Sequence, residues 1–108
     1  MKVLITGCDA PLGALLSNCL STSGEVTPVG EAVSAAAELR DGDYVAADLG
    51  EPDEVQELLV GVDAIVHAQP FAPSIAVGVD EAEILDRIAR GTYVLATAAI
   101  ESGIARMV

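Results

Sequence analysis

Aromatic residues, cysteine, histidine and lysine are all scarce in this sequence. Aromatic residues make up 3% of the 108 residues and tryptophan is absent, so the hydrophobic core has to be built from aliphatic side chains. Cys8 and Cys19 are the two cysteines, which fits a reducing compartment better than a disulfide framework. His67 is the single histidine, and no cysteine or histidine cluster has the spacing of a metal site, so we expect no metal.

Positive charge and long apolar runs are scarce as well. Five lysines and arginines stand against 17 acidic residues, and the formal net charge of -12 argues against nucleic acid and anionic membrane as partners. No apolar run approaches the ~18 residues of a membrane span, and no charged-then-apolar leader precedes the first strand. We therefore expect a soluble, cytoplasmic protein with no membrane partner.

The sequence does contain a regular alternation of strand and helix patterns, which predicts one α/β domain with a parallel sheet. Pro28 is unfavourable inside the expected strand Val26–Val29, because proline has no N–H to donate to a neighbouring strand. Strands are expected at Val3–Thr6, Val26–Val29, Tyr44–Ala47, Ala64–His67 and Ile104–Val108. Helices are expected at Pro11–Leu20, Glu31–Arg40, Pro52–Val60 and Asp80–Glu101, with a surface loop at Gln69–Val79.

The most informative segment follows the first strand. It runs Thr6-Gly7-Cys8-Asp9-Ala10-Pro11-Leu12-Gly13, an order that predicts a strand end, a tight turn and a helix start. That geometry presents backbone N–H groups and a helix N-terminus to a phosphate group. Because the net charge of the chain opposes anions, binding there depends on these local N–H groups.

Together with three later segments, this loop resembles the N-terminal half of an extended short-chain dehydrogenase/reductase, of the NAD-dependent epimerase/dehydratase family. The later segments are Asp48-Leu49, Gly61-Val62-Asp63-Ala64-Ile65-Val66-His67-Ala68, and Arg90-Gly91-Thr92 leading to Gly103-Ile104-Ala105-Arg106-Met107-Val108. The resemblance covers essentially the whole chain. It implies a Rossmann-like doubly wound parallel sheet, truncated at the start of the fifth strand. Residues 1–108 would then be a partial NAD(P)-binding domain that lacks the substrate-binding part.

The resemblance also implies the cofactor-binding residues and NAD as the cofactor, with NADP left open. The implied residues are Gly7, Ala10, Pro11, Leu12, Gly13, Glu31, Asp48, Leu49, Ala68, Gln69 and Pro70. Ala10 stands where the family has its middle glycine, and Asp9 adds a negative charge to the loop. A purely structural turn is the alternative interpretation of this loop. Glu31 has an alternative interpretation as a solvated acid at a helix start. Asp48 has an alternative interpretation as a cap of its own loop.

The catalytic residues of the family are missing. Tyr44 and Tyr93 are followed four residues later by Asp48 and Thr97, so the Tyr-x-x-x-Lys pair is absent, and Lys2 is the only lysine. The family asparagine that supports a proton relay is replaced by Ile88. We therefore expect no catalytic residue and no activity in this chain alone.

Two functions remain open at this stage. The chain is either the NAD(P)-binding portion of an oxidoreductase, epimerase or dehydratase that acts by hydride transfer on a sugar-nucleotide-like hydroxyl or carbonyl, or a non-catalytic nucleotide-binding or assembly module. Its expected partners are a dinucleotide and a second copy of itself, bound through an incomplete sheet edge or the helix Asp80–Glu101. His67 is expected as a buried neutral histidine, Cys8 as a small buried residue of the turn, and Cys19 as a core residue.

Overall fold

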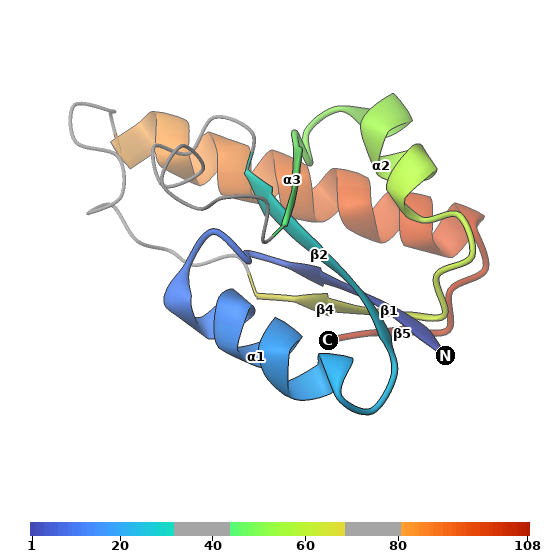
Figure 1. The fold of residues 1–108 in the computed structure, drawn as a ribbon. Coiled ribbons are helices and arrows are strands. Elements are labelled where there is room, and N and C mark those ends of the chain that lie inside the picture. Colours follow the sequence, from blue (N-terminus) through green and yellow to red (C-terminus); the bar gives the residue numbers. More distant parts are fainter. Residues whose placement is uncertain (32–43, 69–80) are drawn as a thin grey trace.

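Five parallel strands form a single sheet in the order β3-β2-β1-β4-β5 (Figure 1). The computed structural model describes residues 1–31, 44–68 and 81–108. Its strands are β1 (Lys2–Thr6), β2 (Glu25–Glu31), β3 (Val45–Ala47), β4 (Ala64–His67) and β5 (Arg106–Met107). Its helices are α1 (Pro11–Ser21), α2 (Pro52–Leu58) and α3 (Glu81–Glu101). The expected helix over 31–40 and the expected loop over 69–79 fall on residues outside the described ranges, apart from Glu31, which ends β2.

Helices cover both faces of the sheet, which confirms the doubly wound Rossmann-like fold. In Figure 1, α1 lies on one face, and α2 and α3 lie on the other. The connection from β1 leads through α1 to β2, whereas the connection from β4 leads through α3 to β5 on the opposite side of the sheet. The order in which the strands are added therefore reverses between β1 and β4, and in open α/β sheets the carboxyl ends of two such strands border the crevice at the topological switch point.

Proline and glycine set the ends of these helices. Pro11 and Pro52 each stand in the first turn of a helix, where the missing N–H costs no hydrogen bond. Gly61 and Gly103 follow α2 and α3 with φ of +76° and +73°, the left-handed conformation that favours glycine. These features explain why the helix boundaries were predictable to within one or two residues.

Pro28 lies inside β2, which is longer than the strand expected at Val26–Val29. The Val29 carbonyl accepts the Cys8 N–H at 2.9 Å, so Val29 directs its backbone polar groups toward the β1 side. Pro28, one residue earlier, directs its nitrogen to the other side, and the described pairing with β3 begins only at Val29. The absent N–H of Pro28 therefore costs no ladder bond in the part of the sheet that the structure describes.

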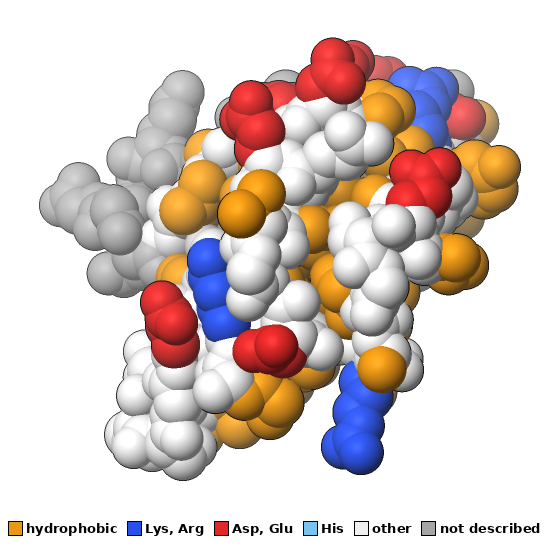
Figure 2. All heavy atoms as spheres, turned by 90° about the vertical axis from the view of Figure 1, so that its right-hand side faces the viewer, with side chains coloured by type: hydrophobic (Ala, Val, Ile, Leu, Met, Phe, Trp, Pro, Cys, Tyr) orange, Lys and Arg blue, Asp and Glu red, His pale blue; other side chains and the backbone are white. Residues whose placement is uncertain are grey.

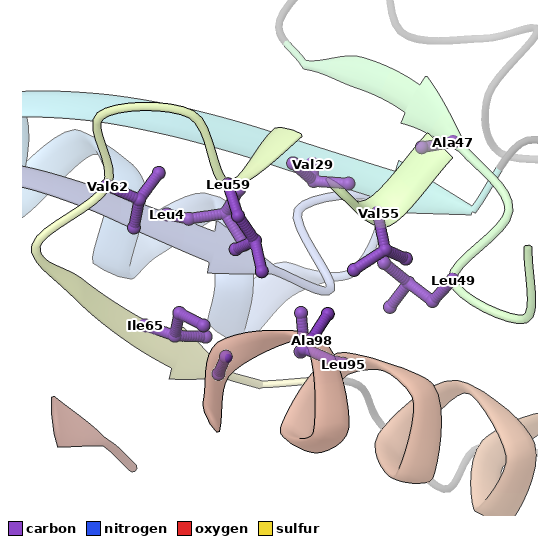
Figure 3. Packing of buried hydrophobic residues seen from close by; sticks show 11 residues of the cluster. Leu4, Val29, Ala47, Leu49, Val55, Leu59, Val62, Ile65, Leu95 and Ala98 are labelled. Carbon is purple, nitrogen blue, oxygen red and sulfur yellow. The ribbon is translucent and has the colours of Figure 1, made fainter. Parts of the chain in front are cut away.

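The main hydrophobic core lies between the sheet and the pair α2 and α3, and its residues are aliphatic, as expected (Figure 3). Leu4, Val29 and Ile65 reach it from the strands. Its other members are Ala47, Leu49, Val55, Leu59, Val62, Leu95, Ala98 and Ala99. Leu85, on an earlier turn of α3, is 52% exposed because the core meets only the later turns of this helix.

The opposite face of the sheet is covered more thinly. Gly13 is the only residue of α1 that is buried, because the helix approaches the β1 turn at that point. Cys19 is exposed, so the expectation that it belongs to the core is wrong. Six residues separate it from Gly13, and at ~100° per residue this turns Cys19 well away from the sheet.

The face that carries the amino ends of the strands shows hydrophobic, acidic and basic side chains interspersed (Figure 2). Met1 and Val60 are among the exposed hydrophobic residues of the chain. Among the helices of the described ranges, none combines the length and the hydropathy that crossing a membrane requires.

We expect Leu95→Ala to lower the free energy of unfolding by about 2–5 kcal/mol, because Leu95 is fully buried and truncation leaves a cavity. Leu85→Ala, the same change on the same helix at a half-exposed position, should cost less than about 1 kcal/mol. Urea unfolding of the two variants measures this difference. Equal losses would contradict the placement of the core against the later turns of α3.

Candidate functional site

The carboxyl ends of the strands bring the expected cofactor-binding residues to one edge of the sheet. Thr6 and His67 are paired at the ends of β1 and β4, and Glu31 and Ala47 are paired at the ends of β2 and β3. The loop after β1, the Asp48 loop and Ala68 therefore follow strand ends at the same edge of the sheet. In Figure 1 the loop after β1 and the end of β4 lie on the left, and the loop after β3 lies toward the top. Gln69 and Pro70 lie outside the described residues, and for Glu31 the structure places only the backbone at the strand end.

The loop between β1 and α1 is a backbone cradle built by two glycines. Gly7 has a φ of +74°, and its carbonyl accepts the Ala10 N–H at 3.0 Å, which closes the turn. A Cβ on Gly13 would lie 2.2 Å from the Gly7 carbonyl oxygen, so no side chain fits at this position. Gly13 thus lets α1 start directly against the turn, as the loop sequence predicted.

The N-terminus of α1 has no side-chain cap. Ala10 is the cap residue and offers no side-chain acceptor, and Pro11 in the first turn has no N–H. The first free N–H groups of the helix belong to Leu12 and Gly13, and they carry the positive end of the helix dipole. The cradle therefore fits an anionic group such as a pyrophosphate.

Asp9 is the one feature of this loop that does not suit an anion. It is 7% exposed, and its Oδ1 is buried without a hydrogen-bond partner among the described residues. Its carboxylate stands one residue before the cap of α1, where the helix dipole favours a negative charge. Asp9 thus adds a negative charge to a loop whose N–H groups otherwise suit an anion.

Cys8 in the same loop has a structural environment. It is buried, and its single thiol proton has two carbonyl acceptors within reach, that of Ile5 at 3.3 Å and that of Gly13 at 3.6 Å from Sγ. This confirms the prediction of a small buried residue in the turn. The thiol ties the end of β1 to the first turn of α1.

At the end of β2, a tyrosine ring fills the space beside Gly30. A Cβ at Gly30 would lie 2.4 Å from the ring of Tyr44, so an acidic side chain does not fit at this position while the ring stays in place. The resemblance found in the sequence implies that Gly30 stands at the position where family members carry a ribose-binding acid. An acid that binds the ribose hydroxyls therefore has to come from another position. Glu31, the next residue in the sequence, is the candidate.

Asp48 caps its own loop. Its Oδ1 accepts the Gly50 N–H at 2.9 Å, and its carbonyl accepts the Glu51 N–H at 3.1 Å, so it shapes the turn that leads into α2. The side chain of Leu49 is buried in the core, which leaves its backbone at the sheet edge. The capping role of Asp48 is thus observed, and the adenine contact expected for Asp48 and Leu49 stays a prediction.

A chain of side-chain hydrogen bonds crosses the switch point. Thr6 Oγ1 lies 2.6 Å from Nδ1 of His67, and Nε2 of His67 lies 2.9 Å from Thr92 Oγ1 on α3. The Ala68 N–H donates to Thr6 Oγ1 at 3.1 Å. Sequence reasoning missed the roles of Thr6 and Thr92, because only tertiary structure brings residues 6, 67 and 92 together.

We assign the proton of His67 to Nε2. In this tautomer the Thr6 hydroxyl, whose oxygen accepts the Ala68 N–H, donates to Nδ1, and Nε2–H donates to Thr92. The ring is half-buried, and desolvation lowers the pKa of His67 below its ordinary value of 6.5. The expectation of a neutral histidine agrees with this environment, although the ring is less buried than expected.

A family model described as "NAD dependent epimerase/dehydratase family" matches residues 3–108. No curated protein matches the chain. Among solved structures, the fold is similar to that of the UDP-glucose 4-epimerase from Thermotoga maritima with UDP-glucose. The TM-score is 0.78 at 19% identity, over 99% of this chain and 36% of that one.

Two further solved structures are similar in fold. The first is a short-chain dehydrogenase/reductase superfamily protein from Agrobacterium tumefaciens with bound NAD, with a TM-score of 0.76 and 24% identity over 99% of this chain and 31% of that one. The second is a mutated uronate dehydrogenase, with a TM-score of 0.71 and 27% identity over 98% of this chain and 37% of that one. This chain therefore spans about a third of the length of these relatives.

The lowered pKa of His67 predicts a pH dependence of stability. Between the folded-state pKa and 6.5, the unfolded chain binds more protons than the folded chain, so the free energy of unfolding falls as the pH drops through that range. Urea unfolding at pH 7.5 and pH 5 should show a smaller fall for His67→Gln than for the unmodified chain, because carboxylate titration is common to both. Equal falls in the two proteins would contradict the desolvated, neutral ring.

Proposed function

This chain belongs to the NAD dependent epimerase/dehydratase family, and from that premise we propose that it binds a nicotinamide dinucleotide at the carboxyl edge of its sheet. In this proposal, residues 1–108 form the NAD(P)-binding domain of an oxidoreductase, epimerase or dehydratase. The substrate class is a sugar-nucleotide-like hydroxyl or carbonyl compound. The related structure with bound NAD supports the cofactor class.

The backbone cradle after β1 is the observation that carries the proposal. Gly7 turns the chain with a positive φ, and the bare Cα of Gly13 lets the uncapped N-terminus of α1 face the crevice. Leu12 and Gly13 would donate their N–H groups to the pyrophosphate, and Ala10 and Pro11 would shape the loop around it. Ala68, at the end of β4, would lie beside the nicotinamide ribose together with Gln69 and Pro70.

The adenosine end would lie over β2 and β3. Glu31 would accept hydrogen bonds from the ribose hydroxyls, and a carboxylate at that point disfavours the 2′-phosphate of NADP. Asp48 and the backbone of Leu49 would border the adenine. We therefore propose NAD as the cofactor, in a cytoplasmic protein.

The bound dinucleotide supplies hydride transfer, and the residues of this chain supply its binding and orientation. The sequence has no Tyr-x-x-x-Lys pair and one lysine, Lys2, which lies in β1 with its Nζ 3.2 Å from the Val60 carbonyl. Neutral His67 is held between two threonine hydroxyls. We therefore propose that these 108 residues alone bind the dinucleotide and do not turn over substrate.

Isothermal calorimetry with NAD tests the cradle. We expect Gly7→Ala to weaken binding at least about tenfold, ~1.4 kcal/mol, because the Cβ strains the turn and enters the phosphate cradle. Gly61→Ala is the matched control, since Gly61 has nearly the same φ and lies between α2 and β4. It should carry similar strain and leave NAD affinity unchanged.

The double variant Asp9→Ser with Ala10→Gly, in the same titration, should bind NAD about tenfold more tightly, because it removes a negative charge and a methyl group from the cradle. NAD binding that Gly7→Ala and the double variant both leave unchanged would contradict the proposed site. NAD-dependent turnover by the 108 residues would contradict their proposed role in binding alone.

A second proposal is self-association through α3. Tyr93 and Ile100 are 72% and 79% exposed, and together with Leu85 they lie within about 80° of one another around the helix. A two-fold contact between two copies of this stripe would bury all three side chains in each copy. The exposed apolar stripe therefore supports a role of α3 in self-association. This role is compatible with nucleotide binding and would also suit a non-catalytic assembly module.

Light scattering at high micromolar concentration tests this second proposal. We expect a dimer for the unmodified chain and a monomer for Ile100→Asp, because a buried unpaired carboxylate opposes the contact. Glu101→Gln is the control, because Glu101 is exposed on the same helix outside the stripe, and it should leave the dimer intact. A monomeric unmodified chain would overturn the proposal.

A further inference from the structure

The main-chain ladder between β1 and β4 stops at the edge of the proposed cofactor crevice. Its last pair in the described residues is Thr6 with His67. Beyond this pair, Gly7 leaves the strand with its positive φ on the way to α1, and Ala68 is the first residue after β4. The described backbone pairing between the two sides of the proposed crevice therefore ends at Thr6 and His67.

Thr6 replaces the missing backbone pairing with a side-chain contact. Its hydroxyl oxygen accepts the Ala68 N–H at 3.1 Å, which joins the end of β1 to the first residue after β4. The side chain is fully buried, so an unmade hydrogen bond here would leave polar groups without solvent. The position of Ala68 relative to the Gly7 turn thus depends on the rotamer of a single threonine.

His67 and Thr92 hold that rotamer. In the assigned tautomer, Nδ1 of His67 accepts a hydrogen bond from the Thr6 hydroxyl at 2.6 Å, which leaves lone pairs of the threonine oxygen for the Ala68 N–H. Nε2–H of His67 then donates to Thr92 Oγ1 at 2.9 Å, which orients the ring. The relay runs from α3 through β4 to β1 and ends at the crevice.

We propose that His67 and Thr92 are positioning residues of the dinucleotide site, which act through Thr6 to set the separation of the Gly7 turn and Ala68. The inference rests on the proposed function, because the crevice matters as the place of the pyrophosphate and the nicotinamide ribose. Neither residue contacts the ligand in this account. Their effect on affinity comes from pre-organisation of the two sides of the crevice.

Thr92→Val tests the relay, because valine keeps the shape of threonine and removes the hydroxyl. NMR of the ligand-free chain reports on the three hydrogen bonds of the relay, from Thr92 through His67 and Thr6 to Ala68. We expect the Ala68 amide to exchange roughly fivefold faster, the effect of losing one hydrogen bond, and the ring nitrogens of His67 to show the Nδ1–H tautomer beside the Nε2–H tautomer. Thr92→Ser should restore both signals.

Calorimetry with NAD measures whether the relay affects the affinity for the dinucleotide. Thr92→Val should weaken NAD binding roughly fivefold, and Thr92→Ser should restore it. Thr97→Val is the matched control, since Thr97 is also half-buried on α3 and lies beyond the relay. It should change neither the Ala68 exchange rate, nor the histidine tautomer, nor the affinity.

Three outcomes decide the matter. Unchanged Ala68 exchange in Thr92→Val overturns the inference, and so does faster exchange of all amides that Thr97→Val reproduces, because that is general destabilisation. A normal relay response in a chain that binds no NAD supports the positioning of the crevice and refutes the proposed function instead. The two hypotheses therefore fail in distinguishable ways.

Discussion

The close approach of Gly13 to the Gly7 carbonyl is the constraint on which the rest of the structure depends. Any side chain at Gly13 would overlap the turn, so α1 can start directly beside the end of β1 only with glycine there. This contact aims the uncapped helix N-terminus at the carboxyl edge of the sheet. It also places Cys8 where its thiol ties the strand to the helix. The fold and the candidate phosphate site thus follow from the same steric fact.

Electrostatics in this chain work against an anionic ligand at long range and for it at short range. The net charge of -12 repels a dinucleotide at distance, and Asp9 adds to the loop a carboxylate oxygen that has no hydrogen-bond partner among the described residues. The N–H groups and dipole at the start of α1 are local and partly shielded from solvent, so they act with less screening. In the proposed site, the affinity for a dinucleotide therefore depends on the balance between repulsion by negative charge and attraction by the α1 N–H groups. A substitution of Asp9 can shift this balance.

The sheet is held together in two ways. Between β1 and β4 the backbone ladder suffices up to Thr6 and His67, and beyond that pair a relay of hydroxyl and imidazole groups continues the connection. A neutral histidine suits this role, because one ring nitrogen accepts and the other donates. Protonation would turn the acceptor into a second donor, and the Thr6 hydroxyl proton would lose its acceptor. The burial that lowers the pKa of His67 thus also keeps the relay intact.

The element order, the parallel sheet and the glycine loop could be predicted from the sequence, because strand and helix periodicity, Pro11, Gly61 and Gly103 act over a few neighbouring residues. The sequence also indicated which strand ends carry Asp48 and Ala68, since parallel strands end at one edge. Tertiary structure alone decided the tolerance of Pro28, the exposure of Cys19 and Leu85, and the space that the Tyr44 ring takes from Gly30. It also decided the relay, because residues 6, 67 and 92 meet only after strands and helix have packed. Local patterns specify elements, whereas contacts between distant residues depend on how those elements are packed together.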